Sequence, residues 1–308
     1  MEALVFDGIL QYHEEYPKPV PEPGESLVRV LLAAICNTDR EILKGYRPDF
    51  KGVLGHEFVG MVEESEEEGL LGKRVVAELN TGCGECVYCK TGREKHCISR
   101  RVLGIHHRNG IFAGYAAIPN ASLHVVPEGL SNAQAVFTEP LAAALDIPRQ
   151  YHLPPDEAVA LVGDGRLAFM IAQVLALYGI ELHIFGHHGE KLEAFAPFGL
   201  SSLTPEGSYE TVIEATGSQG GLETALSLTR SQGRLIIKST YAGKAQVDMS
   251  EVVVREIQIL GSRCGPFPPA LKLLEKGLIS FPPLDLYPLR EYEKAFASRA
   301  FKSGFYFP

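Results

Sequence analysis

Four cysteines in a span of fifteen residues have the spacing of a single metal-binding cluster. They are Cys83, Cys86, Cys89 and Cys97, in the pattern C-x2-C-x2-C-x7-C. Four thiolates can surround one tetrahedral metal ion, and zinc is the usual occupant of an all-sulfur site. Because four protein ligands leave no position for a substrate, the cluster predicts a structural metal ion. Any metal-dependent chemistry must then use ligands elsewhere in the chain.

A second motif is typical of dinucleotide binding. Gly163-x-Gly165-x-x-Ala168 matches the G-x-G-x-x-G/A fingerprint and lies between an apolar run at 158–162 and a helical run at 169–178. The glycines allow a tight turn and the close approach of a pyrophosphate, which the first N–H groups of the helix can bind. A simple tight turn is the alternative, but the strand–turn–helix context favours a dinucleotide. The candidate binding residues are Gly163, Gly165, Arg166 and Leu167.

The segment after the next expected strand bears on the choice between NADP and NAD. An NAD site usually carries an acidic residue about 20 residues after the fingerprint, where it binds the ribose 2′-hydroxyl. Here Gly186 takes that place, and His187, His188 and Lys191 follow it. Cationic side chains complement a 2′-phosphate. The sequence therefore favours NADP over NAD, although the two histidines also fit an exposed loop.

Two regions of the chain differ in their pattern of apolar residues, and each pattern indicates the elements that position these motifs. Short β-type runs separated by glycine and proline lie at 26–33, 58–63, 74–78 and 114–118, and the acidic run 63–68 fits a solvated loop. After about residue 148, apolar strands at 158–162, 181–185, 211–214, 234–238 and 257–260 alternate with helical stretches. This alternation predicts a doubly wound parallel sheet.

The chain end at 281–308 returns to a proline- and aromatic-rich texture and is expected to fold back onto the first domain. The expected domains are 1–147 with 265–308, which includes a metal lobe at about 80–100, and a dinucleotide-binding domain at 148–264.

Length and charge narrow the class of protein. The chain has 308 residues, of which 45% are hydrophobic, and a formal net charge of −9. The acidic balance disfavours nucleic acid as a partner, and no apolar run approaches the roughly 18 residues of a membrane span. The first residues lack the basic-then-apolar pattern of a signal peptide. We expect a cytoplasmic protein, in which reduced thiols favour metal binding over disulfides.

Five segments together resemble the zinc-dependent medium-chain dehydrogenase/reductase family, the alcohol dehydrogenase superfamily. They follow the family's order along essentially the full length: Cys36-Asn37-Thr38-Asp39, Gly55-His56-Glu57, the four-cysteine lobe, Glu139-Pro140 and the Gly163 fingerprint. The resemblance implies a GroES-like β-rich catalytic domain joined to a Rossmann domain.

The resemblance also implies the ligands of a catalytic zinc, which spacing alone could not join. They are Cys36, His56 and Glu139, with Glu57 as an alternate ligand, as in the sorbitol, threonine and glucose dehydrogenase branches. Taken singly, each of the first three has an ordinary interpretation as a buried thiol, a core histidine or a helix-start acid. With the structural zinc of the four-cysteine lobe, two zinc ions per chain are expected.

Two further roles follow by analogy with the family. Thr38 is the candidate carrier of the alcohol proton, and Asp39 is the acid that would orient His56. A competing interpretation places residues 38–41 in a capping box at the start of a helix.

The function that the resemblance implies is hydride transfer between NAD(P) and a secondary alcohol, polyol or sugar. A glucose or aldose 1-dehydrogenase is the alternative within this class. A non-catalytic NADP-binding protein that kept the fold is the alternative of another class, and the complete set of implied ligands favours the enzyme. We expect a small-molecule alcohol or carbonyl substrate and a homo-oligomer, either dimer or tetramer.

Overall fold

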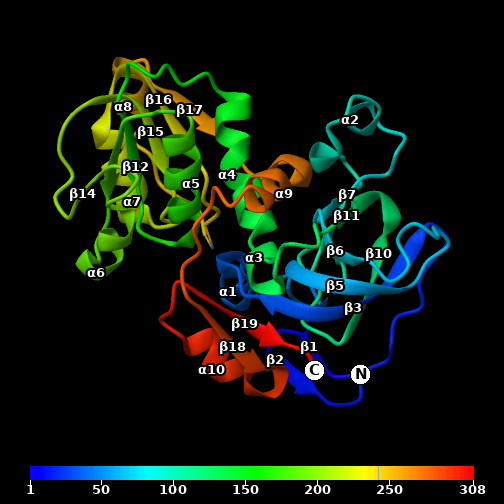
Figure 1. Ribbon diagram of the computed structural model, residues 1–308. Coiled ribbons are helices and arrows are strands. Elements are labelled where there is room, and N and C mark those ends of the chain that lie inside the picture. The colour runs from blue at the N-terminus through cyan, green and yellow to red at the C-terminus, as the bar shows by residue number, and fades with distance from the viewer. Residues whose placement is uncertain (242) are drawn as a thin grey trace. The chain divides into compact units, whose positions relative to one another are not determined.

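The computed structural model describes residues 1–241 and 243–308, drawn in Figure 1. The chain divides into two compact units, Met1–Glu139 with Phe267–Pro308, and Pro140–Pro266. The first expected boundary, at 147/148, falls inside the continuous helix α4 (Thr138–Gln150). The change of texture at Pro148 therefore marks the end of a helix, and we propose two domains with the bounds of the compact units.

The first unit is built mainly from antiparallel strands. Its largest sheet has the order β11-β6-β5-β3-β19-β18, with β10 also paired to β3, and the small sheets are β2-β1-β4 and β7-β8-β9. The strands are β1 Ala3–Phe6, β2 Leu10–His13, β3 Glu25–Ala34, β4 Gly52–Val53, β5 Glu57–Glu64, β6 Arg74–Ala77, β7 Asn80–Thr81, β8 Arg101–Leu103, β9 His107–Arg108, β10 Tyr115–Pro119, β11 Leu123–Val125, β18 Leu284–Pro288 and β19 Lys302–Tyr306.

The C-terminal segment returns to this sheet, as the sequence predicts. Strand β19 pairs with β3 in antiparallel register, with Gly304 opposite Ala34. A side chain at Gly304 would place its Cβ 2.1 Å from the carbonyl oxygen of Ala33, so only glycine fits there. The N-terminal strands β1 and β2 were not predicted, although β1 contributes the fully buried Ala3 and Leu4 to the core.

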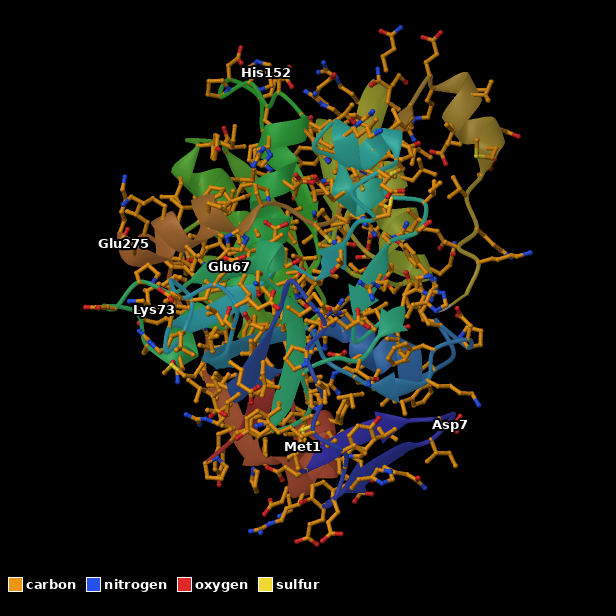
Figure 2. The ribbon with its side chains drawn as sticks, turned by 90° about the vertical axis from the view of Figure 1, so that its right-hand side faces the viewer. Met1, Asp7, Glu67, Lys73, His152 and Glu275 are labelled. Carbon is orange, nitrogen blue, oxygen red and sulfur yellow. The ribbon has the colours of Figure 1, made fainter. Side chains whose placement is uncertain are left out.

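Helices of the first unit are short. They are α1 Asn37–Leu43, α2 Val87–Lys90, α3 Asn132–Ala135, α9 Phe267–Glu275 and α10 Tyr292–Ala297, with 3-10 turns at Glu94–His96, Asn120–Ser122 and Leu289–Glu291. The acidic run 63–68 begins within β5 and continues into the exposed turn that connects β5 to β6. Figure 2 labels Glu67 in this turn and Lys73, the residue before β6. The prediction of a solvated acidic segment is thus confirmed, except that its first two residues are in the strand.

The second unit is a parallel sheet between helices. Its strand order is β14-β13-β12-β15-β16-β17, the doubly wound order of a dinucleotide-binding domain. The strands are β12 Val159–Val162, β13 Leu182–Phe185, β14 Leu200–Ser202, β15 Tyr209–Glu214, β16 Thr229–Ile237 and β17 Gln258–Gly261. The helices are α5 Arg166–Leu177, α6 Gly189–Leu192, α7 Gln219–Leu228 and α8 Met249–Val254, with a 3-10 turn at Glu193–Phe195.

Burial on both faces explains the continuous apolar runs in the central strands such as β12 and β15, whereas the edge strands β14 and β17 are mostly exposed. Ala160, Val212 and Leu235 pack with residues of α7 in one core. The alternate residues Leu161 and Ile213 point to the opposite face, because side chains alternate along a strand, and both are also fully buried. Helix α5 contacts β12 and β13. In the part of the chain that the structure describes, no helix is both long and apolar enough to cross a membrane.

Candidate active site and metal centres

Three potential metal ligands converge in the first unit. Cys36 immediately precedes α1, His56 immediately precedes β5, and Glu57 is the first residue of β5. The ligand atoms of Cys36, His56 and Glu57 all lie within 4.8 Å of one another. His56 and Glu57 are 3% and 2% exposed. A thiolate, an imidazole and a carboxylate are donor types that bind a catalytic zinc ion.

Strand register explains how ligands distant in sequence become neighbours. Strands β3 and β5 are antiparallel, and Ala34 lies opposite Glu57. Cys36, two residues after Ala34, is thereby brought beside His56, one residue before Glu57. Gly55 adopts a φ of +92°, and a Cβ there would lie 2.4 Å from the ring of Phe112. Glycine at this position therefore lets the chain deliver His56 into the site.

The surroundings of His56 favour an additional positive charge. Asp39 Oδ1 lies 3.5 Å from His56 Nδ1, and within the described residues neither buried atom has a hydrogen-bond partner. Burial lowers the pKa of His56, but the negative charges of Asp39 and Cys36 outweigh burial and hold the pKa well above its usual value. A divalent metal ion would supply the positive charge that this donor set lacks, so the residues fit a zinc ion.

Glu57 also belongs to a buried ion pair that the sequence did not reveal. Lys302 Nζ donates to Glu57 Oε2, and the two side chains are only 1% and 2% exposed. Removing one partner of such a pair leaves a buried charge uncompensated, which typically costs about 3–5 kcal/mol. The ammonium group of Lys302 lies against the Glu57 carboxylate, within the group formed by Cys36, His56 and Glu57.

Glu139 lies near this group without being part of it. It follows Thr138 at the start of α4, and its negative charge helps to raise the pKa of His56. Among the described residues, the cluster of ligand atoms within 4.8 Å contains Glu57 and does not include Glu139. The sequence predicts Glu139 as the third ligand and Glu57 as its alternate. In the structure, Glu57 is the carboxylate that lies closer to Cys36 and His56.

The capping interpretation of Thr38 is wrong. Helix α1 begins at Asn37 with Cys36 as its N-cap residue, and the Asp39 side chain reaches back to accept a 2.8 Å hydrogen bond from the Cys36 amide. Thr38 lies within the first turn, and its Oγ1 is 3.7 Å from Cys36 Sγ. The hydroxyl therefore lies beside the candidate metal ligand, where it could receive a proton.

The four cysteines form a second and separate group. Cys83, Cys86, Cys89 and Cys97 have sulfur atoms within 4.8 Å of one another, and the described cysteines are all free of disulfides. Helix α2 begins directly after Cys86. Hydrogen bonding from the Cys89 amide is the main cause that lowers the pKa of Cys86 to about 6. Burial is the main cause that raises the pKa of Cys89 to about 12, so the convergence of the four sulfur atoms, and not a shared thiol acidity, is what fits a metal ion with four thiolate ligands.

The fingerprint turn joins β12 to α5 in the second unit. Gly163 has a φ of +138°, and a Cβ there would lie 2.9 Å from the Ala215 carbonyl oxygen. Gly165 is the N-cap residue of α5, so the helix begins at Arg166, three residues earlier than predicted. Its first amides, including that of Leu167, have no partner within the helix. The turn lies at the carboxyl ends of β12 and β15, where the strand order reverses and such sheets bind ligands.

A carboxylate lies where the sequence indicated none. Asp164 Oδ2 accepts hydrogen bonds from the His187 amide at 2.7 Å, the His188 amide at 2.8 Å and His188 Nδ1 at 2.9 Å. Burial raises the pKa of Asp164, but these hydrogen bonds outweigh burial and lower it. A Cβ on Gly186 would lie 2.7 Å from that of Asp164, which explains the glycine there.

Comparison with known proteins agrees with this geometry. Residues 22–128 match the Alcohol dehydrogenase GroES-like domain. The chain is 30% identical to D-arabitol-phosphate dehydrogenase of Enterococcus avium over 90% of this chain and 88% of the relative. It is 28% identical to sorbitol dehydrogenase of Halalkalibacterium halodurans, covering 94% and 92%. Alcohol dehydrogenase TADH of Thermus sp. ATN1 is 26% identical, with a TM-score of 0.85 and 99% coverage of both chains.

A GroES-like unit with a doubly wound dinucleotide-binding unit defines a medium-chain dehydrogenase. The chain belongs to the zinc-type alcohol dehydrogenase superfamily of these enzymes. Membership makes it an oxidoreductase of the alcohol dehydrogenase type.

Proposed function

We propose that the chain is a zinc-dependent dehydrogenase that transfers hydride between a polyol or sugar alcohol and NAD(P). The observation that carries this proposal is the convergence of Cys36, His56 and Glu57 in a buried site apart from the four-cysteine lobe. Relatives at 28–30% identity are named for sorbitol and for D-arabitol phosphate, which supports the substrate class. A non-catalytic binding protein would have no need for a second metal-binding set.

The residues of the first unit have distinct tasks in this reaction. Cys36 and His56 would hold the metal with Glu139 as third ligand and Glu57 as its alternate. Zinc would supply Lewis acidity toward the alcohol oxygen. Asp39, 3.5 Å from His56, would orient the imidazole. Thr38 would take the alcohol proton first, since its hydroxyl is adjacent to Cys36 Sγ.

A substrate panel tests the proposed function. We expect the protein, purified with zinc, to oxidise members of a panel of secondary alcohols, polyols and aldoses with NADP or NAD. Fastest turnover of aldoses would identify the aldose 1-dehydrogenase alternative. Absence of turnover across the panel, in a protein that binds the dinucleotide, would favour the non-catalytic alternative.

We propose NADP as the preferred dinucleotide. Support comes from Gly186 in place of an acid and from the nearby His187, His188 and Lys191. Asp164 adds a negative charge at this segment, but its carboxylate is engaged by His188 and by two amides. The basic side chains are therefore expected to determine which dinucleotide binds more tightly.

Replacing Lys191 with alanine should weaken NADP binding about tenfold and change NAD binding by less than twofold, because only NADP carries the 2′-phosphate. Dissociation constants measured by fluorescence titration provide the readout. The same substitution at Lys73, an exposed lysine of the other unit, is the matched control and should change neither constant. Tighter binding of NAD than NADP by the unaltered protein would overturn the preference.

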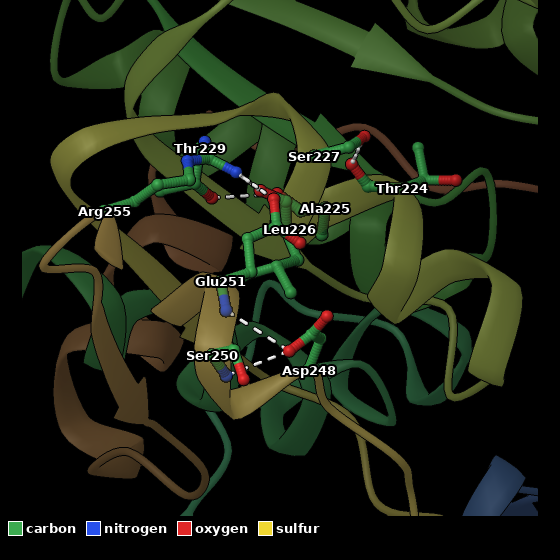
Figure 3. Close-up of polar contacts among 9 residues, drawn as sticks. All are labelled: Thr224, Ala225, Leu226, Ser227, Thr229, Asp248, Ser250, Glu251 and Arg255. Atoms are coloured by element: carbon green, nitrogen blue, oxygen red, sulfur yellow. Dashed lines mark hydrogen bonds and ion pairs between the residues drawn. The ribbon is translucent and has the colours of Figure 1, made fainter. Parts of the chain in front are cut away.

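We further propose a cytoplasmic homo-oligomer, a dimer or tetramer. Strand β17 is at the sheet edge, and the neighbouring α8 exposes Val253 and Val254 by 70% and 82%. Figure 3 shows how Asp248 caps α8 through the Ser250 and Glu251 amides. Exposed apolar side chains beside an open strand edge are typical of association surfaces. Light scattering should give two or four times the 33.6 kDa chain mass; a monomer would contradict this.

Cell fractionation tests the proposed cytoplasmic location, and recovery of the protein outside the cytoplasmic fraction would overturn it.

A further inference from the structure

A cluster of basic side chains lies beside the loop that leads to His56. It consists of Arg47, Arg100, His106 and His107, and we refer to it as the Arg47 cluster. Arg47 Nη2 donates to His106 Nδ1, and the rings of His106 and His107 lie with their centroids 3.8 Å apart and their planes tilted by 46°. Burial, followed by the positive charges of Arg47, His107 and Arg100, lowers the pKa of His106, while Asp49 acts in the opposite sense. The surroundings of His106 therefore carry an excess of positive charge.

Hydrogen-bond donors of this cluster lack acceptors. Within the described residues, the buried Nε atoms of Arg47 and Arg100 have no hydrogen-bond partner. Asp49 accepts one bond, from Arg47 Nη2 at 3.2 Å. Because Arg47 donates to Nδ1 of His106, the imidazole carries its proton on Nε2 and is a further donor. Buried guanidinium N–H groups are costly to leave unpaired, so the cluster is suited to an anionic acceptor.

Backbone contacts place the cluster close to the candidate metal site. A Cβ on Gly104 would lie 2.2 Å from the carbonyl oxygen of Gly55, the residue before His56. His106 follows Gly104 by two residues, so their Cα atoms are at most about 7 Å apart. Arg47 follows α1, which begins directly after Cys36. One side of the cluster thus follows the helix that begins after Cys36, and the other side lies against Gly55, the residue before His56.

We propose that the Arg47 cluster binds an anionic group of the substrate, so that the natural substrate is a polyol or sugar bearing a carboxylate or a phosphate. This inference rests on the proposed function and specifies its substrate class. Guanidinium groups bind both anions through paired N–H donors. The hydroxyl to be oxidised would reach the Cys36–His56 site while the anionic end contacts Arg47 and Arg100. In a purely structural role, the cluster would only join the turn after α1 to the loop at 104–110.

Matched substrates distinguish these roles. We would measure kcat and KM for a pentitol, the corresponding pentitol phosphate and the corresponding pentonate. The unaltered enzyme should use one anionic substrate with a kcat/KM about 100-fold above that of the pentitol. In Arg47→Gln this ratio should fall toward one, mainly through KM, and Arg47→Lys should restore it in part. Arg101→Gln removes a neighbouring exposed arginine and should leave the ratio unchanged. The phosphate and carboxylate arms identify which anion is preferred.

Thermal shifts provide a readout that does not depend on turnover. An anionic polyol should raise the melting temperature of the unaltered protein and not that of Arg47→Gln, and the pentitol should raise neither. Equal use of neutral and anionic polyols would overturn the anion site while leaving the proposed dehydrogenase function intact. If no polyol is oxidised, the proposed function fails, and the thermal shift alone decides whether the cluster binds anions. Absence of any shift would overturn the site.

Discussion

Replacing Cys36 with alanine is expected to lower kcat/KM by about a thousandfold or more. Cys36 is the only thiol in the buried group with His56 and Glu57 among the described residues, and its loss leaves a metal ion with too few ligands. The Lewis acidity of a catalytic metal supplies several kcal/mol of transition-state stabilisation, which corresponds to this factor. Steady-state kinetics with the best substrate of the panel provides the measurement.

Controls separate this loss from a general defect. Dinucleotide affinity should be unchanged, because the fingerprint lies in the other unit. Cys264→Ala removes a cysteine that belongs to neither metal-binding group and should keep turnover within about twofold. Retention of more than a tenth of the activity in Cys36→Ala would remove Cys36 from the catalytic site.

Separate Glu139→Ala and Glu57→Ala variants identify the third ligand of the metal. We expect the loss of Glu139 to abolish turnover.

Replacing Cys89 with serine is expected to act on stability first and on activity only as a consequence. The four-cysteine lobe offers few regular elements of its own, namely α2 and one 3-10 turn, so a bound metal ion would supply much of the energy that orders it. We expect the melting temperature to fall by roughly 10 °C or more. Differential scanning calorimetry measures this change.

The contrast with Cys36→Ala makes the second prediction specific. Cys36→Ala should reduce activity with little change in melting temperature, whereas Cys89→Ser should do the reverse at temperatures where the protein is still folded. Treatment with a strong chelator should combine both effects. An unchanged melting temperature in Cys89→Ser, together with an unchanged zinc content, would refute a structural metal in this lobe.

Hydrophobic pattern and short motifs were sufficient for much of the fold. Five of the six strands of the second unit are predicted, and the central ones are recognisable because burial on both faces gives continuous apolar runs, as in Val159–Val162. The edge strand β14 (Leu200–Ser202), which is short and mostly exposed, is missed. The turn at Gly163 was recognised because its conformation requires glycine. Strands β1 and β2 were missed; in β2, Leu10–His13 mixes polar and apolar residues and buries none of them fully, so it lacks the continuous apolar run that marks Val159–Val162.

The candidate site was less accessible to sequence reasoning, because its key contacts are not local. Lys302 and Glu57 are 245 residues apart, and neither residue type nor spacing indicates that they meet. The contacts of Asp164 are also not local, since they join residues 23 and 24 positions apart. Gly186 stands where an NAD site usually carries an acid, so the sequence indicates no carboxylate at this segment, yet the structure supplies one from position 164 through bonds to His187 and His188. The resemblance to a family indicated Cys36 and His56, and strand register brings them together.

The zinc content of two proteins tests the central claim most directly, namely that catalysis uses a metal site distinct from the four-cysteine lobe. Metal analysis of the unaltered protein should find two zinc ions per chain, and Cys36→Ala should retain one zinc ion while remaining folded and inactive. One zinc ion per chain in both proteins would contradict a catalytic metal at Cys36 and His56.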